Sequence, residues 1–143
     1  MISTSHLHPM LVHFPIALIT IGFMADIAFL VFKKEVCLSK TGFYLMIIGT
    51  LSAIAAFMSG NLFTYEPTQG EIVKVFSSHQ TAALITVIIM SIGSTLRIYM
   101  TIAKKEQTLL KWIVFMFYFA GTASVGYTGY MGGTMVYNYM MSL

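Results

Sequence analysis

Four histidines are the residues of this sequence best suited to bind a metal ion or a haem. His6, His8 and His13 lie near the amino terminus, and His79 lies in the second half of the chain. Imidazole nitrogen is a ligand for zinc, copper and haem iron. Because His79 is the only histidine outside the amino-terminal segment, any site that joins two segments must use it. Its partner is then His8 or His13, and the sequence leaves that choice open.

Two charged residues, Asp26 and Arg97, interrupt segments that are otherwise apolar. Each lies seven residues before a lysine, Lys33 or Lys104, that marks the end of its segment, so the two charges are predicted to lie at the same depth. An unpaired charge at the centre of a bilayer costs at least ~2.5 kcal/mol. We therefore predict a structural ion pair between Asp26 and Arg97, with a proton or ion relay as the alternative.

The spacing of these residues connects the charges to the histidines. Asp26 follows His8 by eighteen residues, and Arg97 follows His79 by the same number. Eighteen residues are five turns of an ideal α-helix, so each histidine shares a helix face with its charged residue. An ion pair between Asp26 and Arg97 would therefore bring His8 opposite His79. His13 would be rotated by about 140° from His8. It lies deeper, however, and burial of a polar ring costs free energy unless the ring binds a partner, so depth favours His13 as the ligand.

Glycines occur near the same end of the predicted helices as the histidines, at Gly60, Gly126 and Gly129. Small residues in membrane helices usually permit close helix packing. They would also leave the smooth walls that a flat porphyrin needs. The candidate cofactor site therefore includes these three glycines.

The composition places all these residues in a membrane. Of the 143 residues, 57% are hydrophobic and only 9% are charged, whereas about a quarter of a soluble domain is charged. This excludes a secreted or cytosolic enzyme, and the single cysteine, Cys37, excludes an internal disulfide framework. The net charge of +3 is explained by where the lysines lie, so we expect membrane lipid and no nucleic acid as a partner.

Four segments are long and apolar enough to cross a bilayer, which takes about 20 residues. They cover residues 10–32, 41–63, 79–103 and 109–131. Short connections make successive helices antiparallel neighbours. The sequence thus predicts one all-α domain over residues 1–143, an integral membrane four-helix up-down bundle. His79 would begin the third helix, and the tail after Met131 would lie on the outer surface.

The lysines predict the orientation of this bundle. Six of the seven lie in or beside the first and third connections, and Lys74 lies in the second. Connections that carry an excess of Lys and Arg stay in the cytoplasm. Both termini, and with them all four histidines, are therefore predicted to lie on the outer side.

Two motifs resemble a known family, the bacterial membrane proteins catalogued as domain of unknown function 2231. The first is the opening segment HPMLVHFPIAL, which covers residues 8–18, and the second is GGTMVY, which covers residues 132–137. The resemblance extends over nearly the whole chain. It implies four helices, a histidine at the start of the third helix, as at His79, and an acidic residue late in the first, as at Asp26. Many members carry a further histidine at the position of Tyr139. Some are fused to cytochrome c or rubredoxin-like domains, which implies redox work in a bacterial inner membrane.

The leading prediction of function is a small b-type cytochrome-like electron carrier rather than a stand-alone enzyme. One haem b would lie between the first and third helices near the outer leaflet, bound by His79 and by His8 or His13. Its redox partner would be a periplasmic cytochrome or a quinone, and the sequence leaves the oligomeric state open, a homo-oligomer included. One alternative is a zinc or copper site of His8, His13 and His79 in a sensor or transporter, with Glu66 or water as fourth ligand. The other is a structural membrane subunit.

Overall fold

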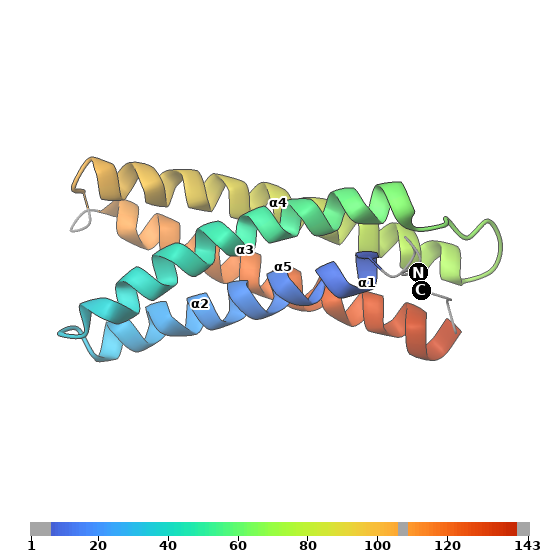
Figure 1. Ribbon diagram of the computed structural model, residues 1–143, viewed down its shortest axis with the longest axis horizontal. Helices are drawn as coiled ribbons and strands as arrows, with labels where there is room; N and C mark the ends of the chain where they lie inside the picture. The colour runs from blue at the N-terminus through green and yellow to red at the C-terminus, as the bar shows by residue number, and fades with distance from the viewer. Residues whose placement is uncertain (1–6, 106–108, 140–143) are drawn as a thin grey trace.

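The computed structural model describes residues 7–105 and 109–139, and all the regular structure in these ranges is helical (Figure 1). The predicted all-α fold with four spans is confirmed, because four helical segments are long and apolar enough to cross a membrane. The first span consists of two helices, and each of the others is a single helix. The helices are α1 (Leu7–Leu11), α2 (His13–Val31), α3 (Val36–Phe63), α4 (Ile72–Ile102) and α5 (Leu109–Tyr139).

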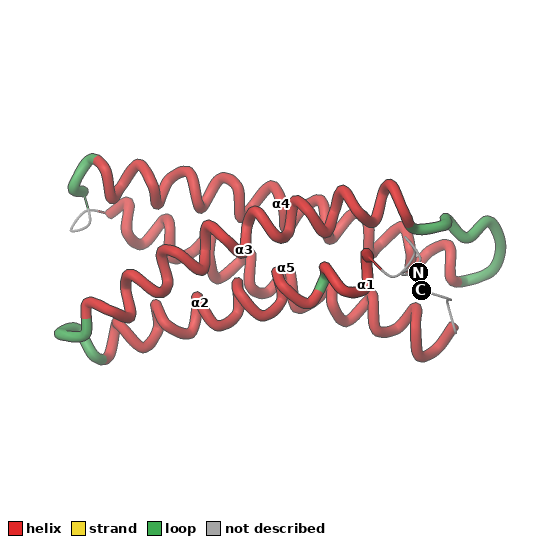
Figure 2. The backbone as a smooth tube through the Cα atoms, in the orientation of Figure 1, coloured by secondary structure: helices red, strands yellow, loops and turns green. Residues whose placement is uncertain are grey.

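A proline explains why the first span is interrupted. Figure 2 shows the short break between α1 and α2, which falls at Val12. Pro15 has no backbone N–H to donate to the carbonyl four residues earlier, so the helix cannot run unbroken through this turn. In the first turn of a new helix that missing donor costs nothing, and α2 accordingly begins at His13. Because of this break, the α1 segment, which carries His8, can be oriented independently of the long helix α2.

Three of the predicted helix bounds need correction. The third spanning helix begins at Ile72 rather than at residue 79, so His79 lies two turns inside α4 and Ser77 and Ser78 are helical residues. The fourth continues to Tyr139 instead of ending near Met131. The second begins at Val36. Hydropathy marks only the part of a helix that matches the bilayer core, whereas a hydrogen-bonded helix can continue beyond it.

The bundle places α2 and α4 on one diagonal. α2 packs against α3 and α5, and α4 packs against the same two helices. The centre is filled by the fully buried side chains of Ile19, Met46, Met90 and Tyr118, one from each long helix. Side chains of α2 and α4 can therefore contact one another only across the core. A site shared by these two helices must lie in the interior of the bundle.

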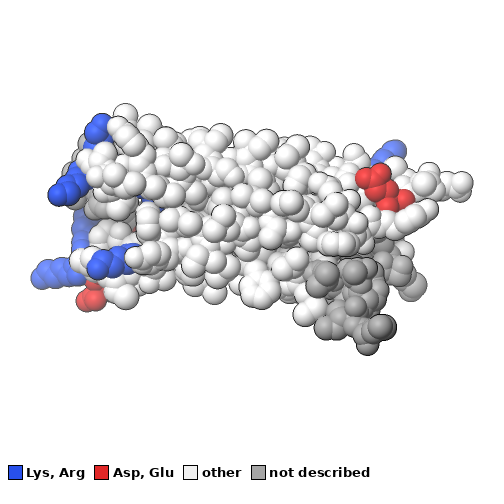
Figure 3. Space-filling view, turned by 45° about the horizontal axis from the view of Figure 1, so that its top comes forward, with Lys and Arg blue, Asp and Glu red and all other residues white. Residues whose placement is uncertain are grey.

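Charged side chains gather at the two ends of the bundle. Figure 3 shows mostly basic residues at one end and mostly acidic residues at the other, separated by a long surface that is almost free of charge. The basic end carries the α2–α3 and α4–α5 connections, and the other end carries α1 and the α3–α4 connection. Transmembrane helices with this uncharged middle place the protein in the membrane as a multi-pass protein.

The orientation of the bundle can be tested at Cys37. This residue is exposed at the lysine end, and it is the only cysteine of the chain. If the lysine end is cytoplasmic, a membrane-impermeant thiol reagent is expected to label Cys37 in permeabilised cells and not in intact cells. The variant Cys37→Ser/Gln69→Cys, with its thiol in the exposed α3–α4 connection, should be labelled in intact cells. Labelling of native Cys37 from outside would reverse the orientation.

Candidate cofactor site

All four spans line a cavity of about 780 Å³ at the end of the bundle opposite the lysines. This lies within the range of ~300–1,000 Å³ of small-molecule sites in proteins. Three of the four histidines, His8, His13 and His79, line it, together with mostly apolar and small residues. The fourth, His6, lies outside the described residues. The cavity is therefore the place where the predicted histidine site has to be assessed.

His8 is held by α3 through one of its two ring nitrogens. Its Nδ1 lies 3.1 Å from the carbonyl oxygen of Ala56 and 2.9 Å from the hydroxyl oxygen of Ser59. A carbonyl only accepts, so Nδ1 carries the hydrogen in the tautomer that satisfies both contacts. The Nε2 atom is then left with a lone pair, which is the form that binds a metal.

His79 is held in the same way by α5. Its Nδ1–H donates to the carbonyl oxygen of Thr128 at 3.0 Å. Neither Nε2 of His8 nor Nε2 of His79 has a hydrogen-bond partner within residues 7–105 and 109–139. One cavity thus contains two imidazoles from the α1 segment and from α4, each fixed at Nδ1 and available at Nε2.

His13 differs from these two in its anchoring. Its Nδ1–H donates at 2.7 Å to the carbonyl of Pro9, one turn earlier in the same span, and the contact is exposed. Within the described part of the chain, no neighbouring helix forms a hydrogen bond with this ring. The structure therefore separates two half-buried histidines held across the bundle from one exposed histidine held by its own chain.

The described residues contain no group of three or more His, Cys, Asp or Glu side chains arranged to hold a metal ion. Glu66, named above as a possible fourth ligand, instead accepts a hydrogen bond from Gln80 Nε2 at 3.2 Å. The arrangement thus gives no support to the three-histidine zinc or copper site.

Two of the three glycines expected at the site line the cavity. A methyl group at Gly60 would lie 2.9 Å from Cε1 of His8, so the bare backbone of α3 is what admits that ring. Gly129 also lines the cavity and faces Ile16. Gly126 is exposed, has no atom within 4 Å of a built Cβ and is not part of the lining.

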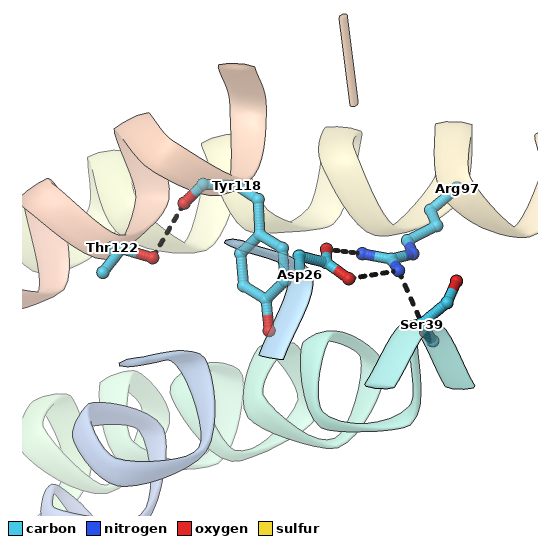
Figure 4. Close-up of polar contacts among 5 residues, drawn as sticks. All are labelled: Asp26, Ser39, Arg97, Tyr118 and Thr122. Atoms are coloured by element: carbon cyan, nitrogen blue, oxygen red, sulfur yellow. Dashed lines mark hydrogen bonds and ion pairs between the residues drawn. The ribbon is translucent and has the colours of Figure 1, made fainter. Parts of the chain in front are cut away.

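A second polar cluster lies deeper in the bundle, towards the lysine end, and Figure 4 shows it. The guanidinium of Arg97 forms a two-pronged ion pair with the carboxylate of Asp26, in which Nη2 donates to Oδ1 at 2.8 Å. Arg97 Nη2 also lies 3.3 Å from the carbonyl of Ser39. Both charged side chains are nearly buried, at 8% and 11% exposure. The pair joins the diagonal helices α2 and α4 at a single depth.

Tyr118 completes this cluster from α5. Its ring lies 5.9 Å from the guanidinium carbon of Arg97, close enough for a cation–π contact. Its hydroxyl is buried and has no hydrogen-bond partner among the described residues. Gly22 and Gly42 leave the space for this hydroxyl and for the Asp26 carboxylate, because a side chain at either glycine would collide with them. Close helix approach is thus what allows these groups to be buried.

A family model described as predicted membrane protein, DUF2231, matches residues 4–142. The chain belongs to this family. Comparison with curated proteins and with solved structures finds no match. The description of the DUF2231 family gives its location in a membrane and no activity, so any function has to be argued from the site.

The two motifs that carry the DUF2231 resemblance meet at the cavity. The first motif contributes His8 and His13 with the prolines beside them, and the second contributes Gly132, Gly133, Val136 and Tyr137. Gly132 faces His79, and a methyl group there would lie 3.4 Å from Cε1 of that ring. Both ends of the DUF2231 chain therefore form one site around His79.

Sequence reasoning missed three residues that shape this site. Ser59 and Thr128 hold the two rings, and Gly132 gives His79 its space. The only signal in the sequence for any of these three residues was the Gly132–Gly133 pair of the second motif. The backbone carbonyl groups that accept from the histidines leave no trace in the residue types of the sequence.

The pairing of His8 with Gly60 predicts a difference between two alanine variants. Gly60→Ala should destabilise the protein by about 1–3 kcal/mol, because a methyl group there overpacks against the His8 ring. Gly126→Ala is the matched control, since it adds the same group where nothing lies within 4 Å. It should be neutral or stabilising, by up to ~1 kcal/mol from helix propensity. Thermal unfolding in detergent measures both, and equal effects would contradict the packing of His8 on α3.

Proposed function

We propose that this protein is a small b-type cytochrome that carries electrons in the bacterial inner membrane. His8 and His79 would hold one haem in the cavity, and both lie on the outer side if the lysine end is cytoplasmic. One observation carries the proposal. Both rings donate Nδ1–H to a backbone carbonyl of a neighbouring helix, which leaves Nε2 unprotonated. Metal-binding histidines commonly have this arrangement, because the second hydrogen bond fixes the ring and raises the basicity of the ligand.

The cavity favours a haem over a single metal ion. Its volume of about 780 Å³ far exceeds what an ion needs, and most of its lining is apolar. Two imidazoles without a carboxylate or thiolate suit haem iron better than zinc, which takes three or four protein ligands. Gly60, Gly129 and Gly132 keep the walls free of side chains. The volume, the two imidazoles and the glycines therefore all favour a haem as the group that would fill the cavity.

The contacts also favour His8 over His13 as the second ligand. His8 is fixed by Ala56 and Ser59 of another helix, whereas His13 is exposed and fixed only by Pro9. A ligand that is held before the cofactor arrives loses less conformational entropy on binding. His13 remains at the cavity wall as the less constrained of the two rings.

The residues of the cavity would act by holding the haem and by shielding it from water. A bound haem would supply one-electron redox chemistry, and His8 and His79 would hold it through their imidazoles. The Nδ1 hydrogen bonds to Ala56 and Thr128 keep both rings oriented, and the apolar lining limits the access of water. The protein would then pass electrons between a quinol and a periplasmic cytochrome without a substrate reaction of its own.

An absorption spectrum of the protein purified with haem present tests the proposal. We expect a Soret band and, after reduction, sharp α and β bands of a low-spin haem, with about one haem per chain. A colourless protein that contains stoichiometric zinc or copper would establish a metal site instead. A colourless protein without metal would support the remaining alternative, a structural membrane subunit.

A further inference from the structure

A second hollow lies on the other side of the contact between α4 and α5 from the histidine cavity. It is a surface groove of about 350 Å³. Five of its seven lining residues carry a hydroxyl group, namely Ser77, Ser78, Thr81, Ser124 and Tyr127. Ala82 and Ile85 complete the lining. We call this feature the hydroxyl groove.

The hydroxyl groove opens on the lipid-facing side of the bundle. Ser77, Ser78, Thr81 and Tyr127 are exposed, and Ile85 is 46% exposed one turn deeper along α4. α4 has 31 residues, which at 1.5 Å per residue exceeds the ~30 Å of a bilayer core. Its first turns therefore reach the polar interface, while the position of Ile85 lies in the acyl chains. A ligand of the groove would need a polar head at the interface and an apolar body below it.

Most of these hydroxyls are unused by the protein itself. Those of Thr81 and Tyr127 make no hydrogen bond to any residue in the described ranges 7–105 and 109–139. Thr95, also exposed on α4, instead donates to the carbonyl of Ser91 in the preceding turn at 2.8 Å. At the polar interface these exposed hydroxyls are open to water or to a bound molecule. The groove thus presents donors that a bound molecule could satisfy.

Hydrogen bonds connect Ser124 of the hydroxyl groove to the residue that holds His79, because the hydroxyl of Thr128 donates to the carbonyl of Ser124 at 2.8 Å. Thr86 donates its only hydroxyl hydrogen to the carbonyl of Ala82 at 2.8 Å. Ser124, which lies 2.7 Å from Thr86 Oγ1, must therefore be the donor between these two. The carbonyl of Thr128 in turn accepts from Nδ1–H of His79 at 3.0 Å. Thr86 and Thr128 line the histidine cavity, and Ser124 lines the groove.

We propose that the hydroxyl groove binds the ring of a membrane-soluble quinol. Such a molecule combines a flat ring carrying two hydroxyl oxygens with an apolar tail, which matches the polar head and apolar depth of the groove. Ser124, whose own hydrogen is used by Thr86, accepts from one quinol hydroxyl. Thr81 and Tyr127 donate to the ligand oxygens. The inference deepens the proposed function, because it places a lipid-soluble redox partner beside His79, but binding itself requires no haem.

The reduced form is the preferred ligand of this groove. Ser124 offers only lone pairs, so it pairs with the O–H of a quinol and repels the carbonyl oxygen of a quinone. Phosphatidylcholine carries only acceptor oxygens, in its phosphate and esters, so it lacks the donor that Ser124 requires. Preference for quinol over quinone and over phosphatidylcholine is therefore the signature of the proposed site.

Equilibrium dialysis of the full chain in detergent tests this, with a short-tailed benzoquinol under anaerobic conditions and the corresponding quinone as probes. We expect saturable binding, tighter for the quinol. Thr81→Val and Tyr127→Phe should each weaken it about three- to tenfold, as expected for one hydrogen bond. Ser124→Ala should remove the preference for the reduced form. Thr95→Val is the matched control, since it removes a hydroxyl already satisfied within α4, and should change nothing.

The failures of the two proposals can be told apart. Absence of saturable quinol binding, or binding unaffected by both Thr81→Val and Tyr127→Phe, overturns the hydroxyl groove even if the protein contains haem. Displacement of quinol by phosphatidylcholine at equal concentration also overturns it. Quinol binding retained in a protein that never takes up haem supports the groove and removes the cytochrome. Thermal unfolding of each variant checks the fold, and Thr81 and Tyr127 are exposed enough for substitution without loss of core packing.

Discussion

Replacing His79 with alanine is expected to reduce the haem content of the purified protein at least about tenfold. Loss of a partner that merely orients a ligand already costs roughly 10–100-fold in affinity, and loss of the ligand itself costs more. His79 is the only histidine that α4 contributes to the cavity, so no other imidazole can replace it from that side. Haem content is measured from the reduced spectrum after purification under identical conditions.

The neighbouring position supplies the matched control. Gln80 also lines the cavity, but its side chain is bonded to Glu66. Gln80→Ala should keep the low-spin spectrum of the unsubstituted protein. If His79→Ala keeps that spectrum as well, the convergence of histidines on this cavity is incidental and the proposed function fails.

The same measurement distinguishes the two candidates for the second ligand. His8→Ala should remove the haem or convert it to a high-spin form, because a six-coordinate iron would lose one of its two imidazoles. His13→Ala should retain a low-spin spectrum, since that ring is exposed and bonded only to Pro9. The opposite result would transfer the ligand role to His13 and show that the α1 segment changes its position when the cofactor binds.

The second large effect is expected at the ion pair between Asp26 and Arg97. Removing one partner of a buried pair typically costs about 3–5 kcal/mol, because the remaining charge is left buried without compensation. Asp26→Asn and Arg97→Gln should therefore each destabilise the protein strongly. The double variant should lose less than the sum of the two, since neither charge is then stranded.

Thermal unfolding in detergent provides the four stabilities for this double-mutant cycle. Lys40→Gln is a suitable control, because Lys40 is exposed at the same end of the bundle and its charge is solvated. It should shift the stability by no more than about 0.5 kcal/mol. Strictly additive losses at Asp26 and Arg97 would mean that the two residues do not interact in the folded protein.

Composition and spacing by themselves determined the general architecture. A chain that is 57% hydrophobic and 9% charged has too little polar surface for water, and the four apolar segments can satisfy their backbone in lipid only as helices. The matched spacing from Asp26 to Lys33 and from Arg97 to Lys104 placed two charges at the same depth. The membrane class, the number of spans and the residues of the ion pair all follow from composition, from the length of the apolar segments and from residue spacing.

Helix ends were determined less well, for a physical reason. Hydropathy follows the thickness of the bilayer core, but α4 begins seven residues before His79 and α5 continues past Met131, because helical hydrogen bonds persist into the interface. The break at Val12 had a visible cause in Pro15, yet the direction in which the α1 segment turns depends on what it packs against.

Only the tertiary structure decided how the histidines differ. Pattern alone left His8 and His13 as equal candidates, and the distinction rests on contacts with residues far away in the sequence. His8 is bonded to Ala56, 48 residues away, and His79 to Thr128, 49 residues away, in both cases through a backbone carbonyl. A carbonyl is the same in every residue type, so no sequence pattern can mark it as a partner. The space that Gly60 and Gly132 give the two rings likewise exists only once the helices have packed.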